Sequence, residues 1–348
     1  MNDYVHVSFV CAGLNLRECI QGEVRESGVS CDVFGDLTSK MADFLVQSRS
    51  DNTNTKYLSY FNKWKSFIED KGLSPIPASP VHVALYVTDL IDKNVSSSVI
   101  SATVYSIKWA HSLKNLPDPT NNYFVVNLLE TAKRTLSKPV QKKEPISSDS
   151  IKQLCDMYSC STDVLILRDL CMILVAYSGF LRFDELIHLK CNDIVFHDDH
   201  FTIEIRKSKT DQYRLGNQIV ISKGVSSACP FNMLQKYLKY ANLSISKDWF
   251  LFRPVVRSKA ICKLISKDKP LSYTRTRECL VSRLREVVGD SNIGIHSLRA
   301  GGATCAANAG VNDRCWKRHG RWISETSKDG YACDSLERRL SVSKSLDL

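Results

Sequence analysis

Four side chains with hydrogen-bonding or nucleophilic groups lie close together near the C-terminal end of the sequence. His296 and Arg299 are three residues apart, so on a helix they would share one face and could bind the same phosphate. Trp322 supplies an indole N–H donor, and Tyr331, nine residues later, supplies a phenol. Three donors beside one nucleophile predict covalent chemistry on a phosphodiester.

Two short helices are expected to position these groups. The run after His296 is helix-like and rich in small residues, and Gly310 is a suitable residue to end it. A second helix is expected from Asp313 to about His319, with Gly320 ending it. The chain between the indole and the phenol then leaves room for a turn and about two helical turns.

Two further motifs occur earlier in the chain. An arginine and a glutamate lie three residues apart in Phe180-Leu-Arg182-Phe-Asp-Glu185-Leu. Such a pair is usually an exposed ion pair that contributes little to stability. The apolar flanking residues, which extend to Leu189, predict instead a partly buried arginine. The turn Ser208-Lys209-Thr210-Asp211 presents a lysine that could reach a DNA groove, although by itself it is better explained as a solvated turn.

In this order, the motifs resemble the active site of the tyrosine recombinase (phage integrase) family. The family pattern is R-x-x-E-[IL], then a lysine turn, then H-x-x-R, then a tyrosine nine residues after a histidine or tryptophan. The resemblance implies that the catalytic residues are Arg182, Lys209, His296, Arg299, Trp322 and Tyr331, with Glu185 in support. His319 is the alternative to Trp322, but only Trp322 has the nine-residue offset. The G-R-W motif and the A-G-G-A-T helix look more like recombinases of eukaryotic mobile elements.

The resemblance implies a site-specific recombinase or integrase that cleaves and rejoins DNA through a covalent 3′-phosphotyrosyl intermediate. A phenol ionises only at about pH 10 in water, so nearby cations must favour the phenolate. Arg182 and Arg299 would neutralise the two non-bridging oxygens and stabilise the pentavalent transition state.

His296 and Trp322 would donate further hydrogen bonds to those oxygens, and His296 could help with the phenol proton. Lys209 is suited to protonate the 5′-oxygen leaving group. Such a site would need neither a metal ion nor another cofactor, and the reaction would need no ATP.

The positive charge is concentrated in one segment. The formal net charge is +10, and residues 253–285 contain ten Lys or Arg and two Asp or Glu, a local +8. Although a charge run is usually just a solvated face, Arg275 and Arg277 here alternate with hydroxyl side chains, a mixture suited to phosphate oxygens. We interpret the segment, together with Lys207, as a surface that binds the DNA backbone.

The predicted fold class is α+β and mostly helical. Residues 1–36 have no sustained period and are interpreted as an N-terminal extension, either a mobile arm or an addition specific to this chain. Residues 37–137 show helical spacing without strand signals and are expected to form an all-α domain. The resemblance assigns it as the family's core-binding (SAM-like) domain, which clamps DNA. Residues 138–147 contain two prolines and read as a linker.

Residues 148–348 are expected to form the mixed α/β catalytic domain with a small antiparallel sheet. Helices are predicted at 149–158 and 162–178, and strands at 193–196, 201–205 and 218–221. The segment His197-Asp-Asp-His200 contains metal-ligand residue types, but a polar hairpin turn explains it fully. A basic amphipathic helix could follow from Ser335 to about Leu346 and dock on a neighbouring protomer.

Several classes of protein are disfavoured. The longest apolar run, 164–180, is interrupted by Arg168 and Asp169, so a buried helix is expected rather than a membrane span. No signal peptide is recognised near the N-terminus. Thirteen cysteines without a C-x-x-C pair favour reduced thiols in an intracellular protein, nuclear if the host is eukaryotic.

The expected partner is double-stranded DNA, bound by a homo-tetramer, without a membrane or a small-molecule cofactor. Two alternatives remain open from the residues. The chain could be a domesticated DNA-binding protein with lost or weak catalysis, or an enzyme like type IB topoisomerases, which religate the same strand. The target sequence and the choice among integration, excision and inversion are not encoded in these motifs.

Overall fold

The computed structural model describes residues 16–28, 34, 36–139, 141–206, 217–258 and 261–346. The chain divides into two compact units, Met1–Val140 and Gln141–Leu348. The division falls inside the segment 138–147, which the sequence identified as a linker. Each unit has its own hydrophobic core.

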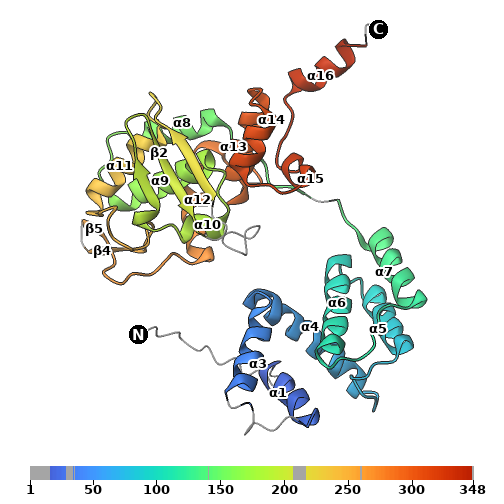
Figure 1. Cartoon of the computed structure of the whole chain (residues 1–348). Helices are drawn as coiled ribbons and strands as arrows, with labels where there is room; N and C mark the ends of the chain where they lie inside the picture. Colours follow the sequence, from blue (N-terminus) through green and yellow to red (C-terminus); the bar gives the residue numbers. More distant parts are fainter. Residues whose placement is uncertain are drawn as a thin grey trace. The chain divides into compact units, whose positions relative to one another are not determined.

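The described part of the first unit is helical (Figure 1). Its helices are α1 (Leu16–Glu26), α3 (Leu37–Gln47), α4 (Asp51–Glu69), α5 (Pro80–Asp92), α6 (Ser97–Leu113) and α7 (Tyr123–Leu136). The apolar periods read from the sequence are the faces that the helices bury: Trp64 of α4, Val87 of α5 and Ile107 of α6 are fully buried in one core. Helix α1 was not expected, because only Ile20 among its described residues is buried and one apolar contact gives no visible period.

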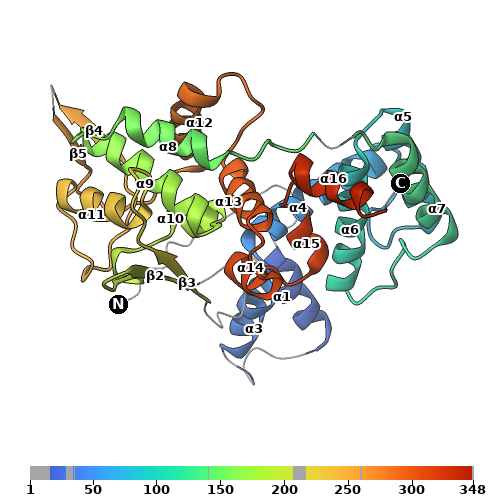
Figure 2. The same cartoon turned by 90° about the horizontal axis from the view of Figure 1, so that it is seen from above.

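The second unit is built around α9 (Val164–Ser178). Its sequence is apolar almost all round, and every residue from Leu167 to Ala176 is buried. Figure 2 shows α9 between α8 (Ser148–Met157) and α12 (Tyr273–Val288) on one side and α11 (Pro230–Tyr240) on the other. The interrupting charges neutralise each other, since Arg168 Nη2 lies 2.7 Å from Asp169 Oδ1 and both side chains are buried. Among the described residues, no helix combines the length and apolar character that crossing a membrane requires.

Two small antiparallel sheets accompany these helices. Strands β1 (Ile194–Phe196), β2 (His200–Ile205) and β3 (Asn217–Ser222) pair in the order β1-β2-β3, close to the predicted bounds. The hairpin β4 (Val255–Ser258) and β5 (Ile261–Leu264) was not predicted, because its four-residue strands lie in the basic segment and carry little alternation. The structure therefore confirms the mostly helical fold with a small antiparallel sheet and adds a second sheet.

The remaining helices of the second unit include those that carry Glu185, His296 and Arg299 and those that flank Arg182, Trp322 and Tyr331. They are α10 (Phe183–Ile187), α13 (His296–Asn308), α14 (Asp313–Gly320), α15 (Glu325–Asp329) and α16 (Leu336–Lys344). A 3-10 turn, η1 (Cys191–Asp193), precedes β1. Helix α13 ends before Gly310, whose φ of 75° is the left-handed conformation expected of a terminating glycine.

Two glycines allow α13 to pack closely on the end of α9. A Cβ atom on Gly301 would lie 2.2 Å from the carbonyl oxygen of Ile146, and one on Gly302 would lie 2.2 Å from that of Tyr177. Both clashes are with backbone atoms, which cannot move aside as a flexible side chain can. The close approach places Arg299, on the same helix, against the chain that follows α9.

Replacing Gly301 with alanine is expected to destabilise the second unit by about 1–3 kcal/mol, since overpacking outweighs the better helix propensity of alanine. Urea denaturation measures the change. Gly224→Ala is the control, because a Cβ there meets its nearest neighbour, Cys229 Cβ, at an ordinary 3.8 Å. Equal stabilities for the two variants would show that α13 tolerates displacement from the backbone at Ile146.

Candidate active site

Arg182 and Glu185 form a buried ion pair at the start of α10. Arg182 Nη1 lies 2.8 Å from Glu185 Oε1, and the Arg182 backbone N–H donates to Glu185 Oε2 at 2.8 Å. The Glu185 side chain is 1% exposed, whereas that of Arg182 is 16% exposed. The prediction of a partly buried arginine is therefore confirmed, and part of its guanidinium faces solvent.

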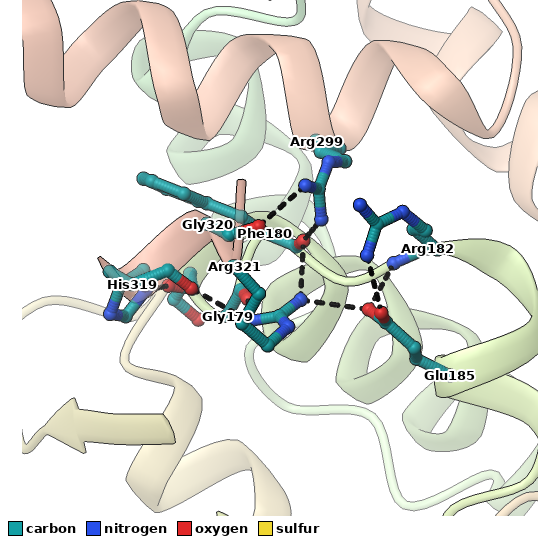
Figure 3. Close-up of polar contacts among 9 residues, drawn as sticks. Gly179, Phe180, Arg182, Glu185, Arg299, His319, Gly320 and Arg321 are labelled. Carbon is teal, nitrogen blue, oxygen red and sulfur yellow. Dashed lines mark hydrogen bonds and ion pairs between the residues drawn. The ribbon is translucent and has the colours of Figure 1, made fainter. Parts of the chain in front are cut away.

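Arg299 lies at the centre of the site and is fully buried. Its Nη1 donates to the carbonyl oxygen of Phe180, and its Nη2 donates to that of Gly320 at 2.6 Å (Figure 3). Burial lowers the pKa of Arg299 to about 9, and repulsion from the Arg182 and Arg321 guanidiniums acts in the same direction. At neutral pH the group stays cationic.

Trp322 and Tyr331 both pack on this guanidinium. Arg299 Cζ lies 4.9 Å from each ring centroid, and the two centroids are 5.6 Å apart. Cations are attracted to aromatic faces in this geometry. Gly320 makes room for the indole, because a Cβ there would lie 2.0 Å from Trp322 Cζ3. The buried Trp322 Nε1–H has no hydrogen-bond acceptor among the residues that the structure describes.

A buried lysine fixes the segment that leads to Tyr331. The Lys328 side chain, 6% exposed, donates to Asp313 of α14 and lies 2.6 Å from Glu325 Oε2. Hydrogen bonds to Asp313 and then Glu325 raise the pKa of Lys328 above its usual range. Its ammonium also lies 5.1 Å from the Trp316 ring centroid, so α14 and α15 are held together just before the tyrosine.

Arg321, between Gly320 and Trp322, was not among the predicted site residues. Helix α14 ends at Gly320 as predicted, but Arg321, with φ 54°, adopts the left-handed backbone that ends it. Its guanidinium is buried and lies 2.8 Å from Glu185 Oε2. A left-handed arginine costs on the order of 1–3 kcal/mol of backbone strain. Its position between Gly320 and Trp322 gave no signal, because the partner Glu185 is 136 residues away.

Glu185 is the carboxylate that this cluster shares. Burial alone would raise the pKa of Glu185, but Arg321, and next the backbone N–H and guanidinium of Arg182, hold the pKa below its usual range. The acid therefore stays ionised between two guanidiniums (Figure 3).

The two histidines considered in the sequence differ in environment. His296, the first residue of α13, is exposed and one turn from the buried Arg299. His319 is partly buried, with Nε2 2.7 Å from the carbonyl oxygen of Ser178 and its ring against Phe180. Burial lowers the pKa of His319, so the neutral imidazole is favoured. The Trp322 ring lies against that of Tyr331, and the choice of Trp322 over His319 as a catalytic residue stays a prediction.

The remaining predicted residues are two lysines and two arginines. Lys207 and Lys209 lie outside the described residues, so their roles stay predictions. Arg275 and Arg277 are exposed on α12, and Tyr273, at its start, packs edge-on against Phe183 with ring centroids 4.9 Å apart. This end of α12 is therefore next to the start of α10, which follows Arg182.

The His197–His200 turn does not gather further ligands. The two imidazoles stack with centroids 4.2 Å apart, and His200 Nδ1 lies 2.6 Å from Asp199 Oδ1. Across the described ranges, no group of three or more His, Cys, Asp or Glu side chains could hold a metal ion.

A mostly helical fold with small antiparallel sheets, and two arginines gathered beside a tryptophan and a tyrosine, define the class of protein. Residues 145–332, more than half of the chain, match the phage integrase family. The chain belongs to this family of tyrosine recombinases.

Individual recombinases are also similar to this chain in sequence and in fold. The integrase/recombinase xerD homolog of Selenomonas ruminantium is 26% identical over 293 residues, which cover 83% of each chain. The recombinase cre of Escherichia phage P1 is 21% identical over 292 residues, covering 80% of this chain and 82% of that protein. Among solved structures, the XerH site-specific recombinase bound to its difH substrate matches with a TM-score of 0.58 at 16% identity, covering 95% of this chain and 88% of that one.

A transposon integrase extends the likeness in fold. The Tn1549 integrase in complex with transposon right end DNA matches with a TM-score of 0.54 at 13% identity, covering 96% of this chain and all of that one. At these identities the structural matches concern the fold. The resemblance to recombinases of eukaryotic mobile elements stays a prediction.

Replacing Glu185 with glutamine is expected to destabilise the folded protein at pH 7 by about 3–5 kcal/mol, because the buried Arg321 loses its anionic partner. The pKa of Glu185 is lower in the folded protein than in the unfolded chain, where it is about 4.3. The ion pairs therefore stabilise the folded state above that pH, and this contribution is lost as the pH falls through the folded value.

Urea midpoints measured at neutral and acidic pH test this dependence. The difference between wild type and Glu185→Gln should narrow below about pH 4. Glu278→Gln, which alters an exposed pair with Arg275 at 3.7 Å, should change little at either pH. A constant difference for Glu185→Gln would contradict the ionisation assigned to this carboxylate.

Proposed function

We propose that this chain cleaves and rejoins DNA strands through a covalent 3′-phosphotyrosyl intermediate formed on Tyr331. The observation that carries the proposal is the contact between nucleophile and cation: the Arg299 guanidinium lies 4.9 Å from the Tyr331 ring centroid. Arg182 and Glu185 belong to the same polar network. Membership in the tyrosine recombinase family supports this reaction.

The reaction begins with attack of the Tyr331 oxygen on a backbone phosphorus, which expels the 5′-oxygen of the next nucleotide. Arg182 presents its partly exposed guanidinium to one non-bridging oxygen, and Arg299 binds the other. Because Arg299 is fully buried beneath Tyr331 and Trp322, its engagement requires the tyrosine ring to move as DNA enters.

Three further residues complete the proposed chemistry. The indole N–H of Trp322, which has no acceptor within the described part of the chain, donates to the phosphate. Exposed His296 contributes a second donor through one ring nitrogen and accepts the phenol proton of Tyr331 through the other. Lys209 protonates the leaving 5′-oxygen. Since the phosphotyrosyl bond conserves the energy of the broken bond, attack by a 5′-hydroxyl reverses the step.

DNA contact is proposed for the exposed arginines of α12. Arg275 and Arg277 lie on the helix whose first residue packs beside α10, so a strand seated on Arg182 would pass near them. Lys207 belongs to the same proposed surface. The solved lambda integrase tetramer bound to a Holliday junction, which matches this chain with a TM-score of 0.53, supports assembly as a homo-tetramer on DNA. In a eukaryotic host, the protein would act in the nucleus.

Covalent adduct formation tests the nucleophile. A pool of nicked duplexes with randomised cores should yield a protein–DNA band that survives denaturing electrophoresis, and Tyr331→Phe should abolish the band because the phenyl ring has no attacking oxygen. DNA binding should remain within about twofold, since the hydroxyl is not a principal phosphate ligand.

Tyr240→Phe, on the exposed end of α11, is the matched control and should form the adduct normally. An adduct with Tyr331→Phe would assign the nucleophile elsewhere. Binding without any wild-type adduct would favour a DNA-binding protein that has lost catalysis. Relaxation of supercoiled plasmid without strand exchange would favour topoisomerase-like activity.

Metal independence is the second expectation of this proposal. The positive charge at the phosphate comes from guanidiniums, so chelation with EDTA should leave the rate of adduct formation unchanged within about twofold. A loss that added Mg²⁺ restores would show that a divalent cation takes part.

A further inference from the structure

We propose that Arg321 is a positioning residue for strand cleavage. It fixes the positions of the two phosphate-binding arginines, Arg182 and Arg299, relative to each other. The inference rests on the proposed function and extends it. Arg321 is assigned no role by the family pattern R-x-x-E, H-x-x-R and G-x-W, in which it occupies the variable position.

Both Nη atoms of the Arg321 guanidinium donate hydrogen bonds. Its Nη1 donates to the carbonyl oxygens of Gly179 at 3.1 Å and His319 at 2.7 Å. Its Nη2 donates to the carbonyl oxygen of Phe180 at 2.9 Å and to Glu185 Oε2 at 2.8 Å. These partners come from the turn after α9, from α10 and from α14, so one side chain joins the segment of the first arginine motif to the segment that leads to the tryptophan.

Each of the other guanidiniums shares an acceptor with Arg321. Arg182 and Arg321 bind the two oxygens of the Glu185 carboxylate. Arg299 and Arg321 both donate to the single carbonyl oxygen of Phe180, one from each side in Figure 3. A displacement of Arg321 would therefore shift the partners of both arginines.

Arg321 does not itself face a substrate. Its side chain is 3% exposed, compared with 16% for Arg182, and four protein acceptors surround it. A group so placed acts through its neighbours. Burial alone does not separate it from Arg299, which is also fully buried. The difference is that each Nη atom of Arg321 has two protein acceptors, whereas each Nη atom of Arg299 has one among the described residues.

The backbone supports the same conclusion. Arg321 has a φ of 54° and Phe180 a φ of 47°, so two non-glycine residues in the left-handed region are joined by one hydrogen bond. Glycine would adopt the Arg321 backbone without strain. The hydrogen bonds of the guanidinium to this turn offset part of the strain.

Arg321→Gly removes the side chain while relieving the strained backbone, so the relief offsets part of the stability lost with the buried ion pair to Glu185. We expect single-turnover cleavage to fall about 100-fold, the order associated with a small misplacement of catalytic groups, while DNA affinity changes little. The acid limb of the pH–rate profile should move to higher pH, because the carboxylate of Glu185 loses its main cationic partner. Added guanidinium ion should restore part of the rate.

A matched pair of conservative variants provides the control. Arg321→Lys keeps the charge but has a single nitrogen to donate. We therefore expect the cleavage rate to fall about tenfold while the acid limb of the pH–rate profile stays at the wild-type pH. Arg318→Lys, at an exposed position three residues earlier, should cleave at the wild-type rate. If Arg321→Gly fails to fold, the comparison of the two lysine variants decides.

The outcomes distinguish the two claims. The positioning role would be overturned if the wild-type protein forms the adduct and Arg321→Gly cleaves at the wild-type rate with an unshifted acid limb of the pH–rate profile. The proposed function would then still stand. A rate loss proportional only to the unfolded fraction would also overturn the positioning role. Absence of an adduct in wild type would overturn both.

Discussion

Glu185 is shared by guanidiniums that would otherwise repel one another in a buried site. It binds Arg182 through one oxygen and Arg321 through the other, and its field partly offsets the repulsion that both exert on Arg299. Charges removed from water need partners within hydrogen-bond distance. One carboxylate and a few backbone carbonyls meet that need here, which is why the turn after α9, α10, α13 and the end of α14 must all converge on the same place.

Convergence depends on small residues as much as on charge. Gly301 and Gly302 let α13 approach the backbone at Ile146 and Tyr177, and the same helix carries Arg299. Gly320 leaves the space that the Trp322 indole fills. Side chains at these positions would separate the elements that the ion pairs hold together, so steric room and electrostatic attraction have to act at the same residues.

Much of this arrangement was predictable because its signals are local. Apolar periods predicted the helices of the first unit, alternation predicted β1 to β3, and the apolar neighbours of Arg182 predicted its partial burial. Arg321 was not predictable, since its partner Glu185 is 136 residues away and no spacing rule links them. The hairpin β4–β5 was hidden by its lysines and arginines, and α1 by its single described buried residue.

The formal charge of this cluster has a consequence for the order of events. Three guanidiniums, those of Arg182, Arg299 and Arg321, gather near the one carboxylate of Glu185, so positive charge predominates in this cluster. A phosphodiester brings one negative charge and a tyrosinate brings another. For the proposed reaction, both negative charges would be added beside these guanidiniums. Without DNA, the site would therefore keep an excess of positive charge. That charge would stabilise the transition state in which the phosphorus becomes pentavalent.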